Sequence, residues 1–589
     1  MAETTSSATS AANESNNISN GTAEDNGNAA APTPPQGVTT IKPADFHPPL
    51  PLERFVLHEA PDEEEGMPAD VAIVGGGPAG LACAIELARL VRRDPELDED
   101  EVEIAVLEKA GELGEHSLSG AVVNPVAFRE LFPDLKDEDF PFRGPVPHEK
   151  VYFLTGKRAW RVPTPPTMRN RGNYVGSLCE MVRWLGEKAE EAGVTVVTGF
   201  PAESLLVEGE RVRGVRTAPA GLERDGSQGN TYEPGTDISA KITVLAEGVR
   251  GHLTQSWLDW QTVRGENPQI YALGVKELWE VKQPLDTVVH TLGWPLDSHT
   301  FGGSFLYPMG EKQVALGLVA GLDYPNARFD IAVAFQRMKE HPLFRKVLEG
   351  GEMLEWGAKS ITEGGYFSLP ARRHGDGCLL VGESAGFVDV PSLKGIHYAM
   401  HSGILAARTI FEALKKGDTS KDALAGYDTA CDESYIIRDL HRTRNMRLAF
   451  KHGLIRGGAA ASVMMLSSGA LLGDRIPMHD DAWAERAAKK SVAQGYTPDG
   501  TLTFPKLDAV FKSGNTTRDD IPQHLVVGDS VPPELADFYA GMCPAGVYER
   551  EGDKLVVNAP NCVDCKATDV LGPRWTPREG GSGPKYRGM

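Results

Sequence analysis

Three of the seven cysteines lie near the C-terminus with a spacing that suits a metal. Cys543 precedes a proline, and Cys562-Val-Asp-Cys565 forms a Cys-x-x-Cys motif. Thiolates at such spacing are soft ligands for an iron–sulfur cluster or for zinc. The next position in the same frame, three residues after Cys565, is Thr568 instead of a cysteine. The segment therefore predicts a metal site with Cys543, Cys562 and Cys565 as ligands and an open fourth position.

Several occupants fit this donor set. A four-iron cluster would take Thr568, Asp569 or solvent as its remaining ligand, whereas a three-iron cluster has one iron fewer to ligate. Zinc, or a site that has lost its metal, is also compatible with three cysteines. The other cysteines lie in apolar or helical contexts, where buried small side chains are expected. These are Cys83, Cys179, Cys378 and Cys431. So few cysteines in a long chain exclude a disulfide-stapled scaffold and indicate a reducing compartment or a metal site.

A second chemical signal is the run Gly75-x-Gly77-Pro78-Ala79-Gly80, which follows the apolar residues 70–74 directly. In such a run the first glycine permits a tight turn and the second lets the backbone approach a pyrophosphate. The third allows close packing of strand and helix. Because residues 81–93 have a helical pattern, the pyrophosphate is expected at a helix N-terminus.

A second strand, residues 102–107, ends at Glu108, whose carboxylate suits the ribose hydroxyls of a dinucleotide; Lys109 follows. The interval from Gly80 to Glu108 is 28 residues, longer than the usual ~20. An acidic loop at 94–101 accounts for the difference.

Two later strands also run into glycine turns. Residues 242–245 lead into Glu247-Gly248, and residues 379–381 lead into Gly382-Glu383, followed by a helix that contains Gly395. In FAD enzymes of this architecture, such late turns close over the ribityl chain and the flavin ring. No second Gly-x-Gly-x-x-Gly follows a strand, so the chain lacks a nicotinamide domain of its own. FAD is therefore the predicted cofactor.

The elements that must position these residues alternate between strand and helix. Strand signals recur at 194–198, in a hairpin at 205–215 and through a β-rich section at 268–325, whereas helical patterns dominate 394–414 and 425–451. The predicted class is α/β with α+β.

Charge and composition limit the possible partners. The net charge of −22 argues against nucleic acid as a partner. Residues 1–70 hold 12 acids and two bases, and residues 1–40 have a composition typical of disorder. This start resembles neither a secretory signal nor a mitochondrial transit peptide, so a cytoplasmic protein of bacterial type is expected.

Beyond residue 68 the chain resembles the electron transfer flavoprotein–ubiquinone oxidoreductase family almost to its end. The resemblance is carried by the glycine turn, Glu108-Lys109, and the runs at 114–121, 299–307, 543–548, 561–565 and 581–586. It implies a Rossmann-like FAD domain of glutathione-reductase type, an inserted β-rich quinone-binding domain and a C-terminal ferredoxin-like iron–sulfur domain. The implied ranges are a disordered acidic tail at 1–65, FAD-binding parts at 66–265 and 371–495, a quinone-binding domain at 266–370 and an iron–sulfur domain at 496–589.

Members of that family carry FAD and one [4Fe-4S] cluster, and they pass electrons from reduced electron transfer flavoprotein to membrane quinone. By resemblance, Ser119 and Gly120 would contact FAD, Gly302 and Gly303 would contact the quinone, which is ubiquinone or menaquinone, and the three C-terminal cysteines would hold the cluster. The family's fourth cysteine falls on Thr568, which leaves [3Fe-4S] open, and an asparagine falls on Asp389.

The resemblance also implies contact with a membrane surface. Residues 457–473 carry no charge, but 11 of these 17 residues are Gly, Ala or Ser, too weakly apolar to span a bilayer. Because family members are monotopic, segment 453–477 is expected to dip into one leaflet, at the cytoplasmic face of a bacterial inner membrane. Residues 121–131 form a second apolar stretch, for which a packed interior helix is the better interpretation.

Two other functions compete with electron transfer to quinone. An FAD monooxygenase or isoprenoid reductase would share the flavin fold and use NAD(P)H directly, but it leaves the cysteine segment unexplained. A non-catalytic flavin-binding protein with a zinc site would explain the cysteines and would show no turnover.

Overall fold

The computed structural model describes residues 40–62, 64–97, 102–490 and 495–589. Most of the predicted N-terminal tail, up to residue 39, and the acidic residues 98–101 lie outside these described residues.

The glycine turn belongs to a nine-stranded sheet with the order β10-β4-β3-β15-β12-β11-β2, in which β22 pairs with β15 and β21 pairs with β22. β3 runs parallel to β4 and to β15, and β10 and β22 extend the parallel part. Strands of this kind are covered on both faces, which explains the continuous apolar run at residues 71–74. The strands are β2 (Val56–Leu57), β3 (Met67–Val74), β4 (Ile104–Glu108), β10 (Thr195–Thr198), β11 (Ala202–Glu208), β12 (Arg211–Thr217), β15 (Asp237–Leu245), β21 (His374–Gly375) and β22 (Cys378–Leu380).

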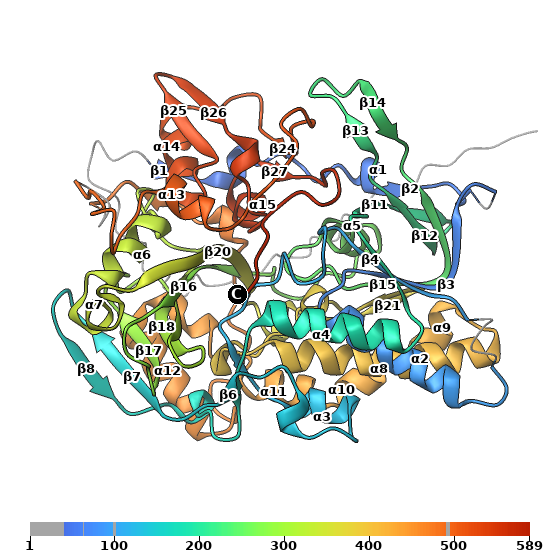
Figure 1. Ribbon diagram of the computed structural model, residues 1–589, viewed down its shortest axis with the longest axis horizontal. Helices are drawn as coiled ribbons and strands as arrows, with labels where there is room; N and C mark the ends of the chain where they lie inside the picture. The colour runs from blue at the N-terminus through green and yellow to red at the C-terminus, as the bar shows by residue number, and fades with distance from the viewer. Residues whose placement is uncertain (1–39, 63, 98–101, 491–494) are drawn as a thin grey trace, which may run out of the picture. The chain divides into compact units, whose positions relative to one another are not determined.

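Helices α2 (Pro78–Arg93), α4 (Leu178–Glu191) and α8 (Ile396–Lys416) pack beside this sheet (Figure 1). α2 and α8 approach so closely that a Cβ on Gly403 would lie 2.2 Å from the carbonyl oxygen of Ala79. This close crossing holds the start of α2 against the segment that carries the late glycine turn.

A second, seven-stranded sheet has the order β20-β16-β19-β18-β17-β7-β8. Its strands are β7 (Glu149–Leu154), β8 (Ala159–Val162), β16 (Tyr271–Glu280), β17 (Val288–Gly293), β18 (Gly302–Pro308), β19 (Gln313–Gly321) and β20 (Glu352–Thr362). The hairpin β7–β8 joins this sheet through parallel pairing of β7 with β17. The predicted range 66–265 for the first FAD-binding part is therefore wrong at this hairpin, because its partner strand lies more than a hundred residues later.

The C-terminal segment packs on the second sheet and shares its hydrophobic core. Its elements are α13 (Lys506–Phe511), β24 (Leu525–Val526), α14 (Pro533–Met542), β25 (Tyr548–Glu551), β26 (Lys554–Val557), α15 (Ala567–Leu571) and β27 (Arg574–Trp575). In Figure 1 these orange and red elements lie next to β20, where the Ser360 amide donates to the Cys565 carbonyl oxygen at 2.8 Å. The mixed α/β class with three such parts confirms the predicted fold class.

The remaining elements are smaller. Short sheets are formed by β1 (Thr40–Ile41) with β23 (Arg486–Ala487), by β5 (Val122–Val123) and β6 (Gly144–Pro145) with β9 (Tyr174–Val175), and by β13 (Ala220–Leu222) with β14 (Gln228–Glu233). The other helices are α1 (Leu52–Phe55), α3 (Val126–Leu131), α5 (His252–Trp260), α6 (Ile331–Lys339), α7 (Pro342–Leu348), α9 (Lys421–Leu424), α10 (Gly426–Glu433), α11 (Tyr435–Arg442) and α12 (Leu454–Leu466).

The predicted disordered tail is wrong for the described part of residues 40–65. Phe55 and Val56 are buried in the core beside β11, and Ile41 is buried beside β23. These few apolar side chains secure the segment, although its overall composition is acidic.

Two apolar segments considered for membrane contact differ in the structure. α3 buries Ala127, Phe128 and Leu131 against the core, as expected of an interior helix. By contrast, α12 buries only Gly457, Ala461 and Met464. Among the described residues, no helix has the length and apolarity needed to cross a membrane.

Candidate functional site

The turn between β3 and α2 uses its three glycines differently. Gly75 has a φ of +114°, and a Cβ there would lie 2.4 Å from the carbonyl oxygen of Ala246. A Cβ on Gly80 would lie 2.2 Å from the carbonyl oxygen of Gly75, so the helix packs directly on the turn. A Cβ on Gly77 would meet no heavy atom of the described residues within 4 Å. Gly77 therefore leaves the open room that a pyrophosphate needs for its approach.

The start of α2 is suited to a negative charge. Pro78 occupies the first turn, and Gly77 as the N-cap offers no side-chain acceptor to the helix amides. Amides at a helix N-terminus carry a partial positive charge and bind phosphate groups. The early turn therefore fits the pyrophosphate of FAD.

Glu108 and Lys109 lie at the carboxyl end of β4, beside this turn. The Glu108 carboxylate accepts hydrogen bonds from the Gly76 amide at 3.0 Å and from the Ala110 amide at 2.9 Å. These bonds fix the carboxylate at the edge where a ribose would extend from the pyrophosphate. Lys109 points elsewhere, because its ammonium group pairs with Asp564 at 2.7 Å.

The late turns meet the early turn in space. A Cβ on Gly382, whose φ is +62°, would lie 2.7 Å from the Cβ of Ala79. The Gly248 amide donates to the Ser384 hydroxyl at 3.1 Å. The early and the late glycine turns, about 300 residues apart in the sequence, thus lie next to each other in space.

Gly395 begins α8 after a short loop. Backbone hydrogen bonds between Asp389 and Lys394, at 2.9 and 3.1 Å, close this loop, and the Asp389 carboxylate accepts from the Ser392 amide at 3.2 Å. A Cβ on Gly395 would come no closer than 3.8 Å to Val388. The backbone of Gly395 therefore has space beside it for another group.

Two glutamates predicted to contact the cofactor have structural partners. Glu247 caps α5: its carboxylate accepts from the Leu253 amide at 3.2 Å and from the Thr254 amide and hydroxyl at 2.6 Å each. Glu383 accepts from the Thr362 amide at 2.8 Å and so ties the late turn to the end of β20. Burial raises the pKa of both carboxyl groups.

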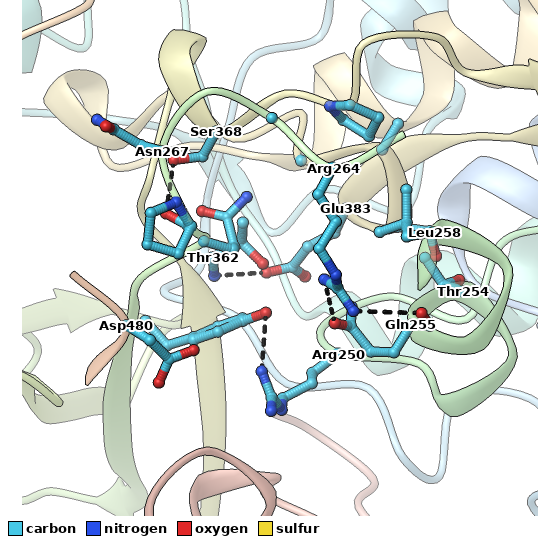
Figure 2. A pocket seen from close by; sticks show the side chains of 18 of the residues that line it. Arg250, Thr254, Gln255, Leu258, Arg264, Asn267, Thr362, Ser368, Glu383 and Asp480 are labelled. Carbon is cyan, nitrogen blue, oxygen red and sulfur yellow. Dashed lines mark hydrogen bonds between the residues drawn. The ribbon is translucent and has the colours of Figure 1, made fainter. Parts of the chain in front are cut away.

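A polar pocket adjoins the late turn (Figure 2). Its volume is about 170 Å³, below the roughly 300–1,000 Å³ of typical ligand pockets. Arg250 and Arg264 line it, but both are engaged: Arg250 pairs with Asp569 at 2.6 Å, and Arg264 donates to the Gln255 side chain at 3.0 Å. Sequence reasoning missed these arginines, because nothing local marks them.

The Ser119–Gly120 loop is held by a buried lysine on β16. The Lys276 ammonium group donates to the Ser119 carbonyl oxygen at 3.0 Å. Burial lowers the pKa of Lys276 from 10.5 to about 8. Among the described residues, a Cβ on Gly120 would meet only the Tyr307 ring, at 3.7 Å, so this loop leaves open room next to the second sheet.

We expect Lys276 to make stability depend on pH. The unfolded chain holds the lysine proton up to about pH 10.5 and the folded chain up to about pH 8, so the free energy of unfolding rises with pH in this window. Between about pH 8 and pH 10 the native chain should gain about 2 kcal/mol relative to Lys276→Met. Denaturant titrations of both proteins at each pH measure the difference, and parallel pH profiles would contradict it.

Gly302 and Gly303 open strand β18. A Cβ on Gly302 would lie 2.0 Å from the Val319 carbonyl oxygen, and one on Gly303 would lie 2.2 Å from that of Thr291. Glycine is therefore required here by the pairing of the strands themselves.

Further along β18, Tyr307 forms a hydrogen bond of 2.6 Å with the Nε2 atom of His290. Burial, together with the nearby Lys394 ammonium group, lowers the pKa of His290 to about 3. The imidazole is therefore neutral near pH 7. Both residues belong to the second sheet, on β17 and β18, and the Tyr307 ring faces Gly120 of the Ser119–Gly120 loop.

The three C-terminal cysteines are all buried, and the backbone carbonyl oxygen of each accepts a hydrogen bond. Lys506 donates to Cys543 at 3.0 Å, Arg578 donates to Cys562 at 3.0 Å, and the Ser360 amide donates to Cys565. Burial raises the pKa of the Cys562 thiol to about 12, and burial and the other two thiols raise the pKa of Cys565. The three thiols thus share one buried region of the C-terminal segment, within the core that this segment forms with the second sheet.

Polar atoms without partners among the described residues surround these cysteines. They include Nε and Nη1 of Arg578 and Oγ of Ser360. Thiolates and donors in one buried place fit an anionic iron–sulfur cluster. Cys83, Cys179, Cys378 and Cys431 are buried elsewhere and unpaired, as expected of small apolar residues.

Asp564, in the middle of the Cys-x-x-Cys motif, is a further residue that the sequence did not single out. Its carboxylate binds Lys109 at 2.7 Å, and Arg578 and the Trp575 indole at 3.0 Å each. Burial opposes its charge, but the neighbouring cations hold the pKa well below its usual range. Through Lys109 it joins the cysteine loop to the end of β4.

Comparisons with known proteins match two parts of the chain to family models. Residues 271–361 match the family model "ETF-QO, ubiquinone-binding", and residues 500–587 match "Electron transfer flavoprotein-ubiquinone oxidoreductase, 4Fe-4S". A curated relative, the mitochondrial electron transfer flavoprotein-ubiquinone oxidoreductase of Oryza sativa, is 41% identical over 89% of this chain and 94% of its own length. The chain belongs to the electron transfer flavoprotein-ubiquinone oxidoreductase family.

The family extends across distant organisms. The Homo sapiens electron transfer flavoprotein-ubiquinone oxidoreductase is 39% identical over 88% of this chain and 89% of its own length. The resemblance read from the sequence motifs is thereby confirmed. The family's second model describes a 4Fe-4S domain and includes all three C-terminal cysteines.

One solved structure supports the fold alone. A geranylgeranyl bacteriochlorophyll reductase-like protein from Thermoplasma acidophilum superimposes with a TM-score of 0.53 at 20% identity. The match covers 69% of this chain and 93% of that chain.

Proposed function

We propose that this chain takes electrons from reduced electron transfer flavoprotein and passes them to a membrane quinone, ubiquinone or menaquinone, through FAD and an iron–sulfur cluster. The observation that best supports the proposal is that one chain of this family contains two sites of the kind that hold cofactors. Gly77 leaves open room at the start of α2, and three buried cysteines lie around the C-terminal site. FAD exchanges one or two electrons and a cluster one at a time, so together they would connect a one-electron donor to a two-electron acceptor.

The protein's own residues would bind and position these groups. For FAD we assign the backbone and carboxylate contacts of the early turn, the Ser119–Gly120 loop and the late turns. The assigned residues are Gly75, Gly77, Pro78, Ala79, Gly80, Glu108, Lys109, Ser119, Gly120, Glu247, Gly248, Gly382, Glu383 and Gly395. Lys109 acts indirectly by fixing the cysteine loop, and Glu247 acts by shaping the Gly248 turn through its cap on α5.

For the cluster we assign Cys543, Cys562 and Cys565, and for the quinone head group the backbone at Gly302 and Gly303. Support for the quinone assignment comes from Phe301, the residue just before β18. Its ring packs on the Phe450 ring with the centroids 4.9 Å apart, and Phe450 lies shortly before the start of α12. This contact brings the start of β18, where Gly302 and Gly303 lie, next to the segment that leads into α12.

The test is anaerobic reduction of the purified chain. Reduced electron transfer flavoprotein should bleach the flavin and reduce a soluble quinone analogue, whereas NADPH alone should do neither. Rapid bleaching by NADPH would favour a monooxygenase or isoprenoid reductase. Stoichiometric zinc without quinone reduction would favour a structural metal site and contradict the proposal.

We further propose that α12 is a membrane-contacting surface. Ile455 and Leu466 are each more than four-fifths exposed, and Leu471 and Leu472 are more than half exposed just beyond the helix. Such a cluster of exposed large apolar side chains indicates a surface that is covered in use. Lys451 and Arg456 flank the start of the helix and suit anionic head groups.

The double variant Ile455→Glu/Leu466→Glu should bind vesicles of phosphatidylcholine and phosphatidylglycerol roughly tenfold more weakly, or worse, because two apolar anchors are lost. Both side chains project into solvent, so the fold should be unchanged. The matched control is Phe511→Glu, which alters an equally exposed side chain on α13. Co-sedimentation measures binding, and equal binding of double variant and control would contradict the proposal.

The compartment stays a prediction. The curated relatives are mitochondrial by name, whereas the sequence of this chain suggested the cytoplasmic face of a bacterial inner membrane. Fractionation of the source cells, with the quinone extracted from the same membranes, would decide both questions.

A further inference from the structure

A buried hydroxyl group stands three residues after the last of the three cysteines. Cys562, Cys565 and Thr568 follow one another at intervals of three residues, and Thr568 lies in the first turn of α15. Its side chain is buried, and its Oγ1 atom donates to the Pro573 carbonyl oxygen at 3.1 Å. A second hydrogen bond of 2.5 Å joins it to the hydroxyl group of Tyr548.

Tyr548 connects Thr568 to the cysteines. Burial raises the pKa of its phenol well above the usual value, and the thiols of Cys543, Cys562 and Cys565 raise it further. The Tyr548 ring also packs on Tyr539, with the ring centroids 5.7 Å apart, and the Cys543 amide donates to the Tyr539 carbonyl oxygen at 3.0 Å. The Thr568 hydroxyl thus lies in the same buried part of the C-terminal segment as the three cysteines.

The nearby carboxylates of Asp569 and Asp564 are engaged by other partners, which disfavours them as iron ligands. Asp569 pairs with Arg250 at 2.6 Å and Arg574 at 2.9 Å, and it accepts from the Trp575 amide at 3.1 Å. Asp564 is bound by Lys109 and Arg578. A carboxylate that left these partners would leave buried cations without a counter-charge, which costs several kcal/mol.

We propose that one iron of the cluster receives an oxygen ligand at Thr568, from its hydroxyl group or from a water in its place, and is the labile iron of the cluster. This inference rests on the proposed function, because it requires the three-cysteine cluster. A neutral oxygen donor binds iron more weakly than a thiolate, which is the ligand that iron–sulfur clusters select. Three irons have a cysteine each, whereas the last one does not.

Lability has a defined chemical consequence. One-electron oxidation by ferricyanide converts [4Fe-4S]²⁺ to [3Fe-4S]⁺ with release of one Fe²⁺, and ferricyanide becomes ferrocyanide. No sulfide leaves, and Cys543, Cys562 and Cys565 keep their bonds to the remaining irons. Added Fe²⁺ with one electron from dithionite reverses the step.

The test uses the full chain purified without oxygen and treated with one equivalent of ferricyanide. The native protein should release about one iron per chain and develop the EPR signal that a [3Fe-4S] centre gives when oxidised. Fe²⁺ with dithionite should remove that signal. Thr568→Cys should keep its full iron content and remain without the signal under the same treatment.

Two further variants separate the sources of the ligand. Thr568→Val has nearly the same shape and no hydroxyl: faster iron loss than native identifies Thr568 Oγ1, and an unchanged rate identifies water. His524→Ala tests a further candidate, since the His524 ring lies within 4.8 Å of the Cys562 sulfur and an Asp564 oxygen. Iron loss that depends on His524 and not on residue 568 would overturn the inference.

The inference is also overturned if native protein and Thr568→Cys retain iron equally after oxidation. In that case the proposed function is still tested separately, by measuring electron transfer from electron transfer flavoprotein to quinone on the same preparations. Absence of iron from both proteins would instead overturn the proposed cluster together with this inference.

Discussion

Gly77→Ala should abolish tight FAD binding while leaving the fold intact. The backbone of Gly77 has φ −85° and ψ −178°, which any residue can adopt, and a Cβ there meets no described atom within 4 Å. The new methyl group would instead occupy the room in which the pyrophosphate approaches the amides of α2. We expect FAD affinity to fall roughly 100-fold, or about 2.7 kcal/mol. Flavin content after gel filtration and titration of the apoprotein with FAD measure the effect.

Two other glycines provide controls for this result. Gly80→Ala would force a Cβ to 2.2 Å from the Gly75 carbonyl oxygen, so it should lower the thermal stability as well as the flavin content. Gly458→Ala adds a methyl group on α12 where a Cβ also meets nothing, and it should change neither property. Normal FAD binding by Gly77→Ala would exclude this turn as the pyrophosphate site.

Asp564→Asn should destabilise the protein by about 3–5 kcal/mol, the usual cost of removing one partner from a buried charge network. The substitution keeps the shape of the side chain but removes the charge that balances Arg578 and Lys109. Arg578 is almost fully buried, so it has no access to water as a substitute partner. Chemical denaturation monitored by tryptophan fluorescence measures the loss.

The same network predicts an order of effects. Lys109→Met should cost less than Asp564→Asn, because Lys109 is partly exposed and only one of the partners of Asp564 is lost. Asp553→Asn, in the exposed turn between β25 and β26, is the matched control and should be neutral. Equal stability of Asp564→Asn and the control would mean that this network does not hold the cysteine loop to β4.

Particular residues show what could and what could not be predicted from the sequence. The glycine turn could be located because strand, turn and helix are continuous in the chain and each glycine has a local steric reason. Hairpin β7–β8 could not be assigned to the second sheet, because only its pairing with β17 decides this. Residues 40–57 were misjudged, since the few apolar side chains that fix them gain their partners from β11 and β23.

The sequence by itself determined the chemistry of this protein: thiolates at metal-ligand spacing, a glycine turn for a dinucleotide, and a family membership carried by contiguous motifs. These features depend on residue type and on neighbours within a few positions. Only the tertiary structure decided which groups remain available. Glu247 is used as a helix cap, Asp569 is held by arginines, and the Thr568 hydroxyl is bonded to Tyr548 in the buried region of the cysteines. Such assignments depend on contacts between residues that are distant in the chain, and burial makes each of those contacts costly to exchange.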